Sequence, residues 1–209
     1  MPVDLAELVH PSRCALVTQE VQAGVVGPDA VLRELADEAQ REAVPNMGRL
    51  CKSARAAGVP VVHCLVTRRA DDLGSNTNAR IFRATRMRGI NLEPGSPGAA
   101  LLPELGPEPT DLVLSRYHGI GPMGRTDLDP VLRNIGATTI VGVGVSVNVA
   151  ITNFVMDAIN NGYTFVLPRD AVAGVPREYA DAVIDNTLSL LATVVTADDV
   201  VQAWAGGTS

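Results

Sequence analysis

Several polar segments of the chain carry side chains that could transfer protons or bind an anion. Glu20 offers a carboxylate for general acid or base chemistry, and His118 offers an imidazole that exchanges protons near neutral pH. Arg116 offers a planar guanidinium that suits a carboxylate but keeps its proton at ordinary pH. The residue types therefore predict a site for a small carbonyl or carboxylated ligand.

Each polar segment follows a short apolar run of the kind that forms a buried strand. We predict strands at residues 13–18, 59–66, 111–114, 138–145, 163–167 and 193–195. Helical patterns alternate with them, at residues 29–42, 45–57, 127–134, 148–161, 177–191 and 197–204. The alternation predicts an α/β fold, a three-layer α/β/α domain with a six-stranded parallel sheet of the Rossmann-like kind.

The carboxyl ends of these strands are where a ligand crevice is expected in an open parallel sheet. We therefore expect the residues that follow the strands to converge: Glu20, Gln22, segment 67–69, Arg116, Tyr117, His118, and Ser146 through Ala150. Gln22 lies two residues after Glu20, so in an extended chain both side chains point the same way and share a pocket. The alternative is that Gln22 only caps neighbouring backbone.

Composition limits the protein class. The chain has 209 residues, of which 46% are hydrophobic and 19% charged, so we expect one compact domain over residues 1–209. The net charge is −6 and no basic run occurs, which argues against nucleic-acid or anionic-membrane partners. No apolar stretch reaches the roughly 18 residues that span a bilayer.

Cysteine usage and the N-terminal residues bear on the compartment. The chain has 3 cysteines with no C-x-x-C spacing, which favours neither disulfides nor zinc and suits a reducing cytosol. The first residues include Asp4 and Glu7 and no long apolar core, so we expect no signal peptide and a cytoplasmic location.

Residues 67–98 interrupt the alternation as a long insertion loop with weak periodicity. Its side chains include Asn76, Asn78, Arg80, Phe82 and Arg83, which could form a lid over an acidic substrate. A solvated loop or a contact between subunits is an equally good interpretation.

Six short motifs, taken together, resemble a known family. They are residues 20–22 (EVQ), 93–99 (EPGSPGA), 124–129 (GRTDLD), 144–150 (GVSVNVA), 157–158 with 162–163 (DA and GY), and 169–171 (RDA). In this order the chain resembles the isochorismatase-like hydrolases, which include nicotinamidases, carbamoylsarcosine amidohydrolases and isochorismatases. The resemblance runs from about residue 13 to residue 196 and implies the isochorismatase-like hydrolase fold.

The resemblance also shows where this chain departs from its family. The thiol members use an aspartate, a lysine and a cysteine nucleophile, and these positions fall on Glu20, Arg116 and Ala150. The only lysine, Lys52, lies inside a predicted helix, and no cysteine follows Cys64. Because a methyl group cannot attack a carbonyl, we do not expect a thiol amidase.

Isochorismatases suggest what chemistry the remaining groups could do. As the resemblance implies, they cleave a vinyl ether by protonation and addition of water, and some members lack the cysteine. We therefore expect an isochorismatase-like hydrolase in which Glu20 acts as acid or base. Arg116 would clamp the substrate anion, assisted by the free backbone N–H groups at Val149 and Ala150.

Two alternatives remain open at this point. Glu20 and Arg116 could form only a structural ion pair, and the chain could be a catalytically silent member that binds a metabolite or partner. His118, the third candidate for catalysis, lies in a glycine-rich loop and could be a simple loop or subunit contact.

The remaining predictions concern binding, metals and assembly. We expect substrate contacts from Gln22, Tyr117, Ser146, Ala150, Asn78 and Phe82. No cofactor is expected, and no metal, because residues 67–71 lack the Asp-x-His pattern that the resemblance associates with a metal in nicotinamidases. His63 is expected to be a hydrogen-bonded core residue. A homo-oligomer, dimer or tetramer, is expected from the resemblance, through residues 117–123.

Overall fold

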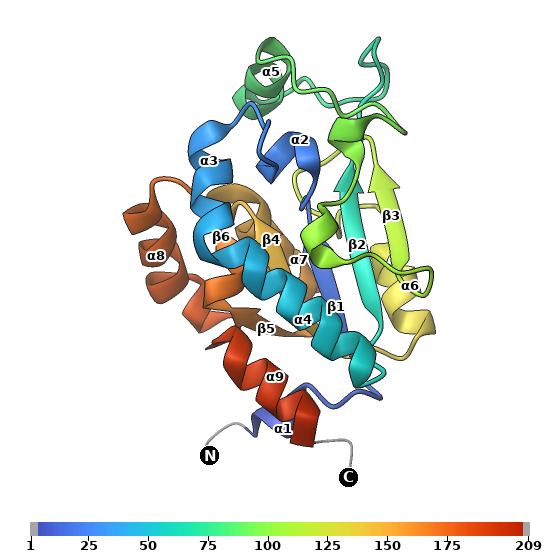
Figure 1. The fold of residues 1–209 in the computed structure, drawn as a ribbon, viewed down its shortest axis with the longest axis vertical. Helices are drawn as coiled ribbons and strands as arrows, with labels where there is room; N and C mark the ends of the chain where they lie inside the picture. The colour runs from blue at the N-terminus through green and yellow to red at the C-terminus, as the bar shows by residue number, and fades with distance from the viewer. Residues whose placement is uncertain (1–3, 207–209) are drawn as a thin grey trace.

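The computed structural model describes residues 4–206 as a parallel sheet with helices on both faces (Figure 1). The strand order is β3-β2-β1-β4-β5-β7, and all neighbouring strands are parallel. These strands are β1 (Cys14–Gln19), β2 (Val61–Val66), β3 (Leu112–Arg116), β4 (Thr139–Val145), β5 (Thr164–Pro168) and β7 (Thr193–Val195). The predicted parallel α/β architecture is confirmed, and the two-residue β6 (Val172–Ala173), paired with β4, raises the strand number from the expected six to seven.

Residues 1–3 and 207–209 lie outside the described residues. The two ends of the domain expected at residues 1–209 are therefore not described. Between residues 4 and 206, no helix has the length and apolar character needed to cross a membrane.

The alternation of side chains along β1 shows why both faces of the sheet are covered. Cys14 and Leu16 belong to one hydrophobic core, and Ala15 and Val17 belong to the other. The first core packs under α4 (Val44–Ala56) and α9 (Ala197–Gly206), with α3 (Arg33–Glu38) beside them. The second packs under α6 (Leu128–Asn134), α7 (Thr152–Asn160) and α8 (Arg177–Asn186). A strand buried on both sides is expected to be mostly apolar, as the first four residues of β1 are; the two polar residues at its end, Thr18 and Gln19, are also buried.

The helices that precede β2 differ from the prediction more than the others do. The two helices expected at 29–42 and 45–57 form one continuous helical stretch, in which the π-helical turn η1 (Ala39–Ala43) joins α3 to α4. Pro45 lacks an N–H group and would be expected to interrupt a helix. The wider turn places the Val44 N–H on the carbonyl of Ala39, so the change of pitch directly before Pro45 lets the chain continue.

The carboxyl ends of the central strands approach each other closely. At Gly144 in β4, φ is 126°, and an added Cβ would lie 2.2 Å from the carbonyl oxygen of Gln19 in β1. Only glycine fits this contact. The glycine thereby lets β1 and β4 come together where Glu20 and Ser146 leave the sheet.

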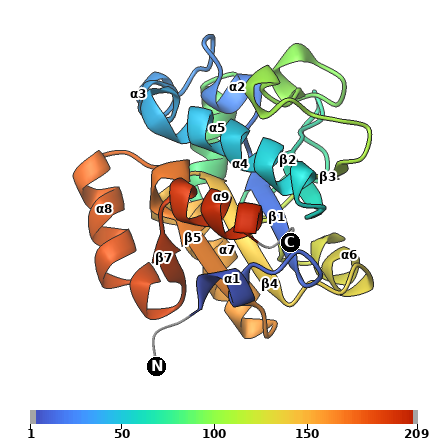
Figure 2. The ribbon, with the colours of Figure 1, turned by 60° about the horizontal axis from the view of Figure 1, so that its bottom comes forward.

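The insertion 67–98 lies beyond this edge of the sheet. It is not irregular throughout, as the sequence suggested, because residues 80–87 form helix α5 (Arg80–Met87). In Figure 1 this helix lies at the end of the molecule toward which β2 and β3 point, close to α2 (Ala23–Val26) and α3. Figure 2 shows the opposite end, where α1 (Leu5–Leu8) lies beside α9.

A buried polar network crosses β1, β2 and the start of β3 away from this edge. His63 Nδ1 is 2.8 Å from Thr18 Oγ1, and His63 Nε2 is 3.2 Å from Asp111 Oδ2. Asp111 also accepts two hydrogen bonds from Arg55, at 2.7 and 3.0 Å. Burial lowers the pKa of His63, against the opposing effect of the Asp111 hydrogen bond. The predicted role of His63 as a hydrogen-bonded core residue agrees with these contacts.

We expect His63 to make the fold acid-sensitive below about pH 6.5, the ordinary pKa of histidine in an unfolded chain. The folded-state pKa lies lower, so the unfolded chain binds more protons as the pH falls through 6.5, and the free energy of unfolding decreases. One such group contributes at most about 1.4 kcal/mol per pH unit. Urea unfolding at pH 7.5 and pH 5.5 measures this decrease.

The matched comparison uses a second histidine. His63→Gln should flatten the dependence between these pH values, whereas His10→Gln, at an exposed position, should keep it. Parallel curves for His63→Gln and the unchanged protein would remove His63 as the cause.

Candidate functional site

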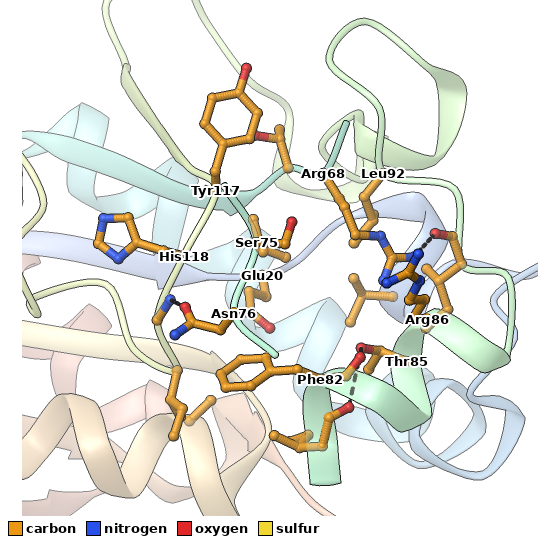
Figure 3. A pocket seen from close by; sticks show the side chains of 18 of the residues that line it. Glu20, Arg68, Ser75, Asn76, Phe82, Thr85, Arg86, Leu92, Tyr117 and His118 are labelled. Atoms are coloured by element: carbon orange, nitrogen blue, oxygen red, sulfur yellow. Dashed lines mark hydrogen bonds between the residues drawn. The ribbon is translucent and has the colours of Figure 1, made fainter. Parts of the chain in front are cut away.

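The cavity at the carboxyl ends of the strands has a volume of about 200 Å³. Figure 3 shows Glu20 inside it, with Ser75 and Asn76 close by, Tyr117 and His118 on one side, and Phe82, Thr85 and Arg86 from α5 on another. Its wall combines polar groups from the loops after β1, β2, β3 and β4 with apolar side chains from α2, α3 and α5. The predicted convergence of segments at this edge of the sheet is what the structure shows.

Glu20 is the carboxylate that this cavity contains at the end of β1. Its backbone has φ of 56°, in the left-handed region that residues other than glycine rarely adopt. One oxygen, Oε1, accepts a hydrogen bond from the guanidinium of Arg116, while Oε2 has no protein partner among the described residues. The side chain is 18% exposed. Glu20 is thus held on one oxygen and open to the cavity on the other.

Arg116 is placed differently from the prediction. The residue is buried, with 6% of its surface exposed, and it donates to Glu20, to the carbonyl of Ile120 at 3.1 Å and to that of Leu65 at 3.4 Å. It does not line the 200 Å³ cavity. Its Nη1 and Nη2 groups donate to Glu20 and to backbone carbonyls, and the buried Nε has no partner among the described residues. Because Arg116 does not line the cavity, the expected clamp on a substrate anion does not fit its position. Arg116 instead positions the Glu20 carboxylate.

Gln22 also has a different position from the one expected. Its side chain is fully buried and does not line the cavity. The amide donates to the carbonyls of Val66 and Ala99, both at 3.0 Å, and accepts from the Val66 N–H at 2.9 Å. This is the backbone-capping alternative. Gln22 joins the end of β2 to the chain entering β3, because its amide can satisfy donors and acceptors at the same time.

The start of the helix that follows β4 also differs from the prediction. Ser146, linked to Val145 by a cis peptide bond, and Ala150 both line the cavity, as predicted. The N–H groups of Val149 and Ala150, however, donate to the Ser146 carbonyl at 3.3 and 3.0 Å. The helix begins with the π-helical turn η4 (Val147–Ile151), which encloses these amides. They are therefore not free to hold an anion, and Ala150 contributes an apolar wall.

The loop after β3 contributes the rim of the cavity. Tyr117 and His118 both line it and are exposed. Gly119 donates its N–H to Asn76 Oδ1 at 2.7 Å, which fastens this loop to the insertion. Exposed Tyr117 and Ile120 are compatible with a subunit contact, and the homo-oligomer stays a prediction that sedimentation can test.

The insertion supplies the remaining wall. Phe82 lines the cavity, whereas Asn78 does not and instead accepts a hydrogen bond from Asn76 at 3.2 Å. Asp72 holds α5 in place, since it pairs with Arg68 at 3.3 Å and with Arg86 at 2.8 Å. Arg83 also lines the cavity and has no ion pair among residues 4–206.

Several cavity residues were missed by sequence reasoning. Val25, Leu35, Ile90 and Leu92 are apolar and lie in segments that give no polar signal, and Asp72 lay in a loop without a pattern. The positive φ of Glu20 likewise had no signature in the sequence.

The thiols of the three cysteines lie outside the cavity and are unreactive near neutral pH. Cys14, Cys51 and Cys64 are all buried, and none of them lines the cavity. Burial raises the pKa of Cys14 to about 11 and those of Cys51 and Cys64 to about 12. Since the thiolate is the nucleophile, these side chains stay unreactive near neutral pH.

Comparisons with known proteins identify the family. Residues 14–199 match the isochorismatase domain, and the chain belongs to this family. A probable isochorismatase from Pseudomonas chlororaphis is 26% identical over 202 residues, covering 96% of this chain and 91% of the relative. The ureidoacrylate amidohydrolase RutB from Pseudomonas syringae pv. syringae (strain B728a) is 28% identical over 176 residues, covering 78% and 71%.

A solved structure agrees with this assignment. An isochorismatase family protein from Burkholderia thailandensis is 25% identical, with a TM-score of 0.73, and the match covers 94% of this chain and 97% of that one. The relatives named as an amidohydrolase and an isochorismatase indicate a family of hydrolases.

We expect the native protein to resist iodoacetamide at pH 8, because all three thiols are buried and protonated there. The variant Ala150→Cys should take up one added group, since residue 150 lines the cavity. Intact-protein mass spectrometry reads both results. Rapid labelling of the unchanged protein at Cys14, Cys51 or Cys64 would contradict the burial argument.

Proposed function

We propose that this chain is a hydrolase that acts on a small carbonyl or carboxylated substrate in the 200 Å³ cavity without a covalent cysteine intermediate. The observation that carries the proposal is the Glu20 carboxylate, which is fixed through Oε1 by a buried arginine and leaves Oε2 open to the cavity. Membership in a family of hydrolases supports the reaction class.

The chemistry follows from which groups face the cavity. A water molecule beside Glu20 transfers a proton to the carboxylate, and its oxygen adds to the substrate carbonyl carbon. The tetrahedral species then collapses, and the leaving group takes the proton back from Glu20. Arg116 keeps the carboxylate oriented, and Ala150 leaves space where a thiol would otherwise stand. His118, on the exposed rim, is a second candidate for exchanging protons with the leaving group.

A substrate carboxylate requires a cation that Arg116 does not provide. Arg83 lines the cavity and has no ion pair within residues 4–206, whereas Arg68 and Arg86 are engaged by Asp72. We assign the binding of an anionic substrate group to Arg83.

Two observations favour the catalytically silent alternative. One oxygen of the Glu20 carboxylate is engaged by Arg116, and Ala150 offers a methyl group at the position of the family's thiol. The cavity could then bind a metabolite without turnover. The experiment on Glu20 decides between the two.

We expect Glu20→Gln to lower kcat by about 100-fold or more on whichever vinyl ether or amide the protein hydrolyses, because the glutamine side chain can neither deliver a proton to a vinyl ether nor accept one from the water that attacks an amide. Glu20→Asp is the matched variant, since it keeps a carboxylate one methylene shorter and should retain part of the activity. Steady-state kinetics, with circular dichroism to check folding, measures both. Full turnover in Glu20→Gln would remove Glu20 from the reaction, and binding without turnover of any compound would favour the silent alternative.

We expect Arg83→Ala to raise KM for a carboxylated substrate about three- to fivefold at unchanged kcat, the modest size of a partly exposed charge pair. Arg88→Ala provides the control, because Arg88 is exposed, directly follows α5 and does not line the cavity. Equal effects of the two variants would show that only the overall positive charge of the insertion matters.

A further inference from the structure

Helix α5 covers the cavity with apolar side chains that have no place in the protein core. None of its residues is buried. Ile81, Phe82 and Thr85 all line the cavity, and their spacing places them on one face of the helix. Met87 at the end of the same helix does not line the cavity and is highly exposed. One face of α5 therefore forms part of the cavity wall.

Phe82 differs from the other phenylalanines in the chain. Of the 3 phenylalanines, Phe154 and Phe165 are fully buried in the core and pack edge to face with their ring centroids 5.0 Å apart. Phe82 belongs to neither hydrophobic core and is only partly buried. Figure 3 shows its ring in the cavity beside Asn76. A large aromatic side chain at this place contributes to the cavity wall and not to the core.

Apolar side chains outside α5 form a second part of the cavity wall. Val25, Leu35, Ile90 and Leu92 line the cavity and come from α2, α3 and the chain that returns from α5. Each of them is at most 8% exposed, so their positions are set by core packing. Ile81 and Phe82 of α5 and these four core-packed side chains therefore line the same cavity.

Of the three arginines that line the cavity, two are engaged by the protein, and the third, Arg83, is exposed and has no ion pair within residues 4–206. Arg68 and Arg86 both pair with Asp72, at 3.3 and 2.8 Å, so their guanidinium groups are engaged with a carboxylate of the protein. The cavity, at about 200 Å³, is large enough for a ring; a void of about 150 Å³ lined by Leu, Ile and Phe accommodates benzene.

We propose that the substrate carries a compact apolar group, aromatic or branched aliphatic, which packs between Phe82 on α5 and the wall formed by Val25, Leu35, Ile90 and Leu92. The carbonyl attached to this group is then the one presented to Glu20. Phe82 is the residue that determines this specificity. The inference rests on the proposed function and specifies its substrate class.

Phenylacetate and acetate test the inference, because they share a carboxylate and differ in the ring. Isothermal titration calorimetry of the full chain should show phenylacetate binding on the order of 100-fold more tightly than acetate. Phe82→Ala should weaken phenylacetate about tenfold, Phe82→Leu less, and Met87→Ala not at all. Phe82→Leu keeps an apolar side chain on α5, and thermal unfolding verifies that each variant is folded.

The results separate this inference from the proposed function. Equal affinity for the two acids, no binding of phenylacetate to the unchanged protein, or equal effects of Phe82→Ala and Met87→Ala would overturn the apolar specificity. Ring-dependent binding that needs Phe82, in a protein that hydrolyses no vinyl ether or amide, would support the specificity and remove the hydrolase proposal.

Discussion

The ion pair between Glu20 and Arg116 is the interaction on which the site depends. A buried guanidinium requires acceptors, because an unpaired buried charge is strongly destabilising. Nη1 and Nη2 of Arg116 find acceptors in the Glu20 carboxylate and in two backbone carbonyls, whereas Nε has no partner among the described residues. The pair joins the ends of β1 and β3, which are separated by β2, and so fixes the carboxylate relative to two strands at once. The same contact that stabilises the arginine gives Glu20 one defined orientation, with its other oxygen open to the cavity.

The fold and the location of the site could be predicted because each rests on a local pattern. The runs at 13–18 and 138–145 are mostly apolar, as is expected of strands buried on both faces, and they correspond to β1 and β4. Parallel strands bring their carboxyl ends to one edge, which placed Glu20, Ser146 and Ala150 on the same cavity. Helix α5 was not predicted because it is short and none of its residues is buried in the core, although Ile81 and Phe82 share the face that lines the cavity. The continuous helix through Pro45 was not predicted because the π-helical turn that precedes Pro45 has no pattern in the sequence.

The roles of single side chains were harder to predict than their neighbourhood. Gln22 and Arg116 lie where the sequence suggested, after β1 and at the end of β3, but neither lines the cavity. Gln22 donates to backbone carbonyls, and Arg116 donates to Glu20 and to backbone carbonyls. The direction of a polar side chain depends on which backbone groups are left unpaired nearby, and those groups exist only once the loops are folded. The backbone amides of Val149 and Ala150 are a second example. They are not free to bind a ligand, because the π-helical first turn directs them to the Ser146 carbonyl.

The site divides into a part fixed by the sheet and a part fixed by the insertion. Glu20, Ser146 and Ala150 are held by strand ends whose packing tolerates little change, as Gly144 against Gln19 demonstrates. The apolar lid is held by the pairs of Asp72 with Arg68 and Arg86 and by the bond between Asn76 and Gly119, and no residue of α5 is buried. Residues of the lid can change without disturbing the core, whereas residues at the strand ends cannot. The chemistry proposed for the strand ends and the specificity proposed for the insertion can therefore vary separately, which fits a family whose relatives carry names as different as isochorismatase and ureidoacrylate amidohydrolase.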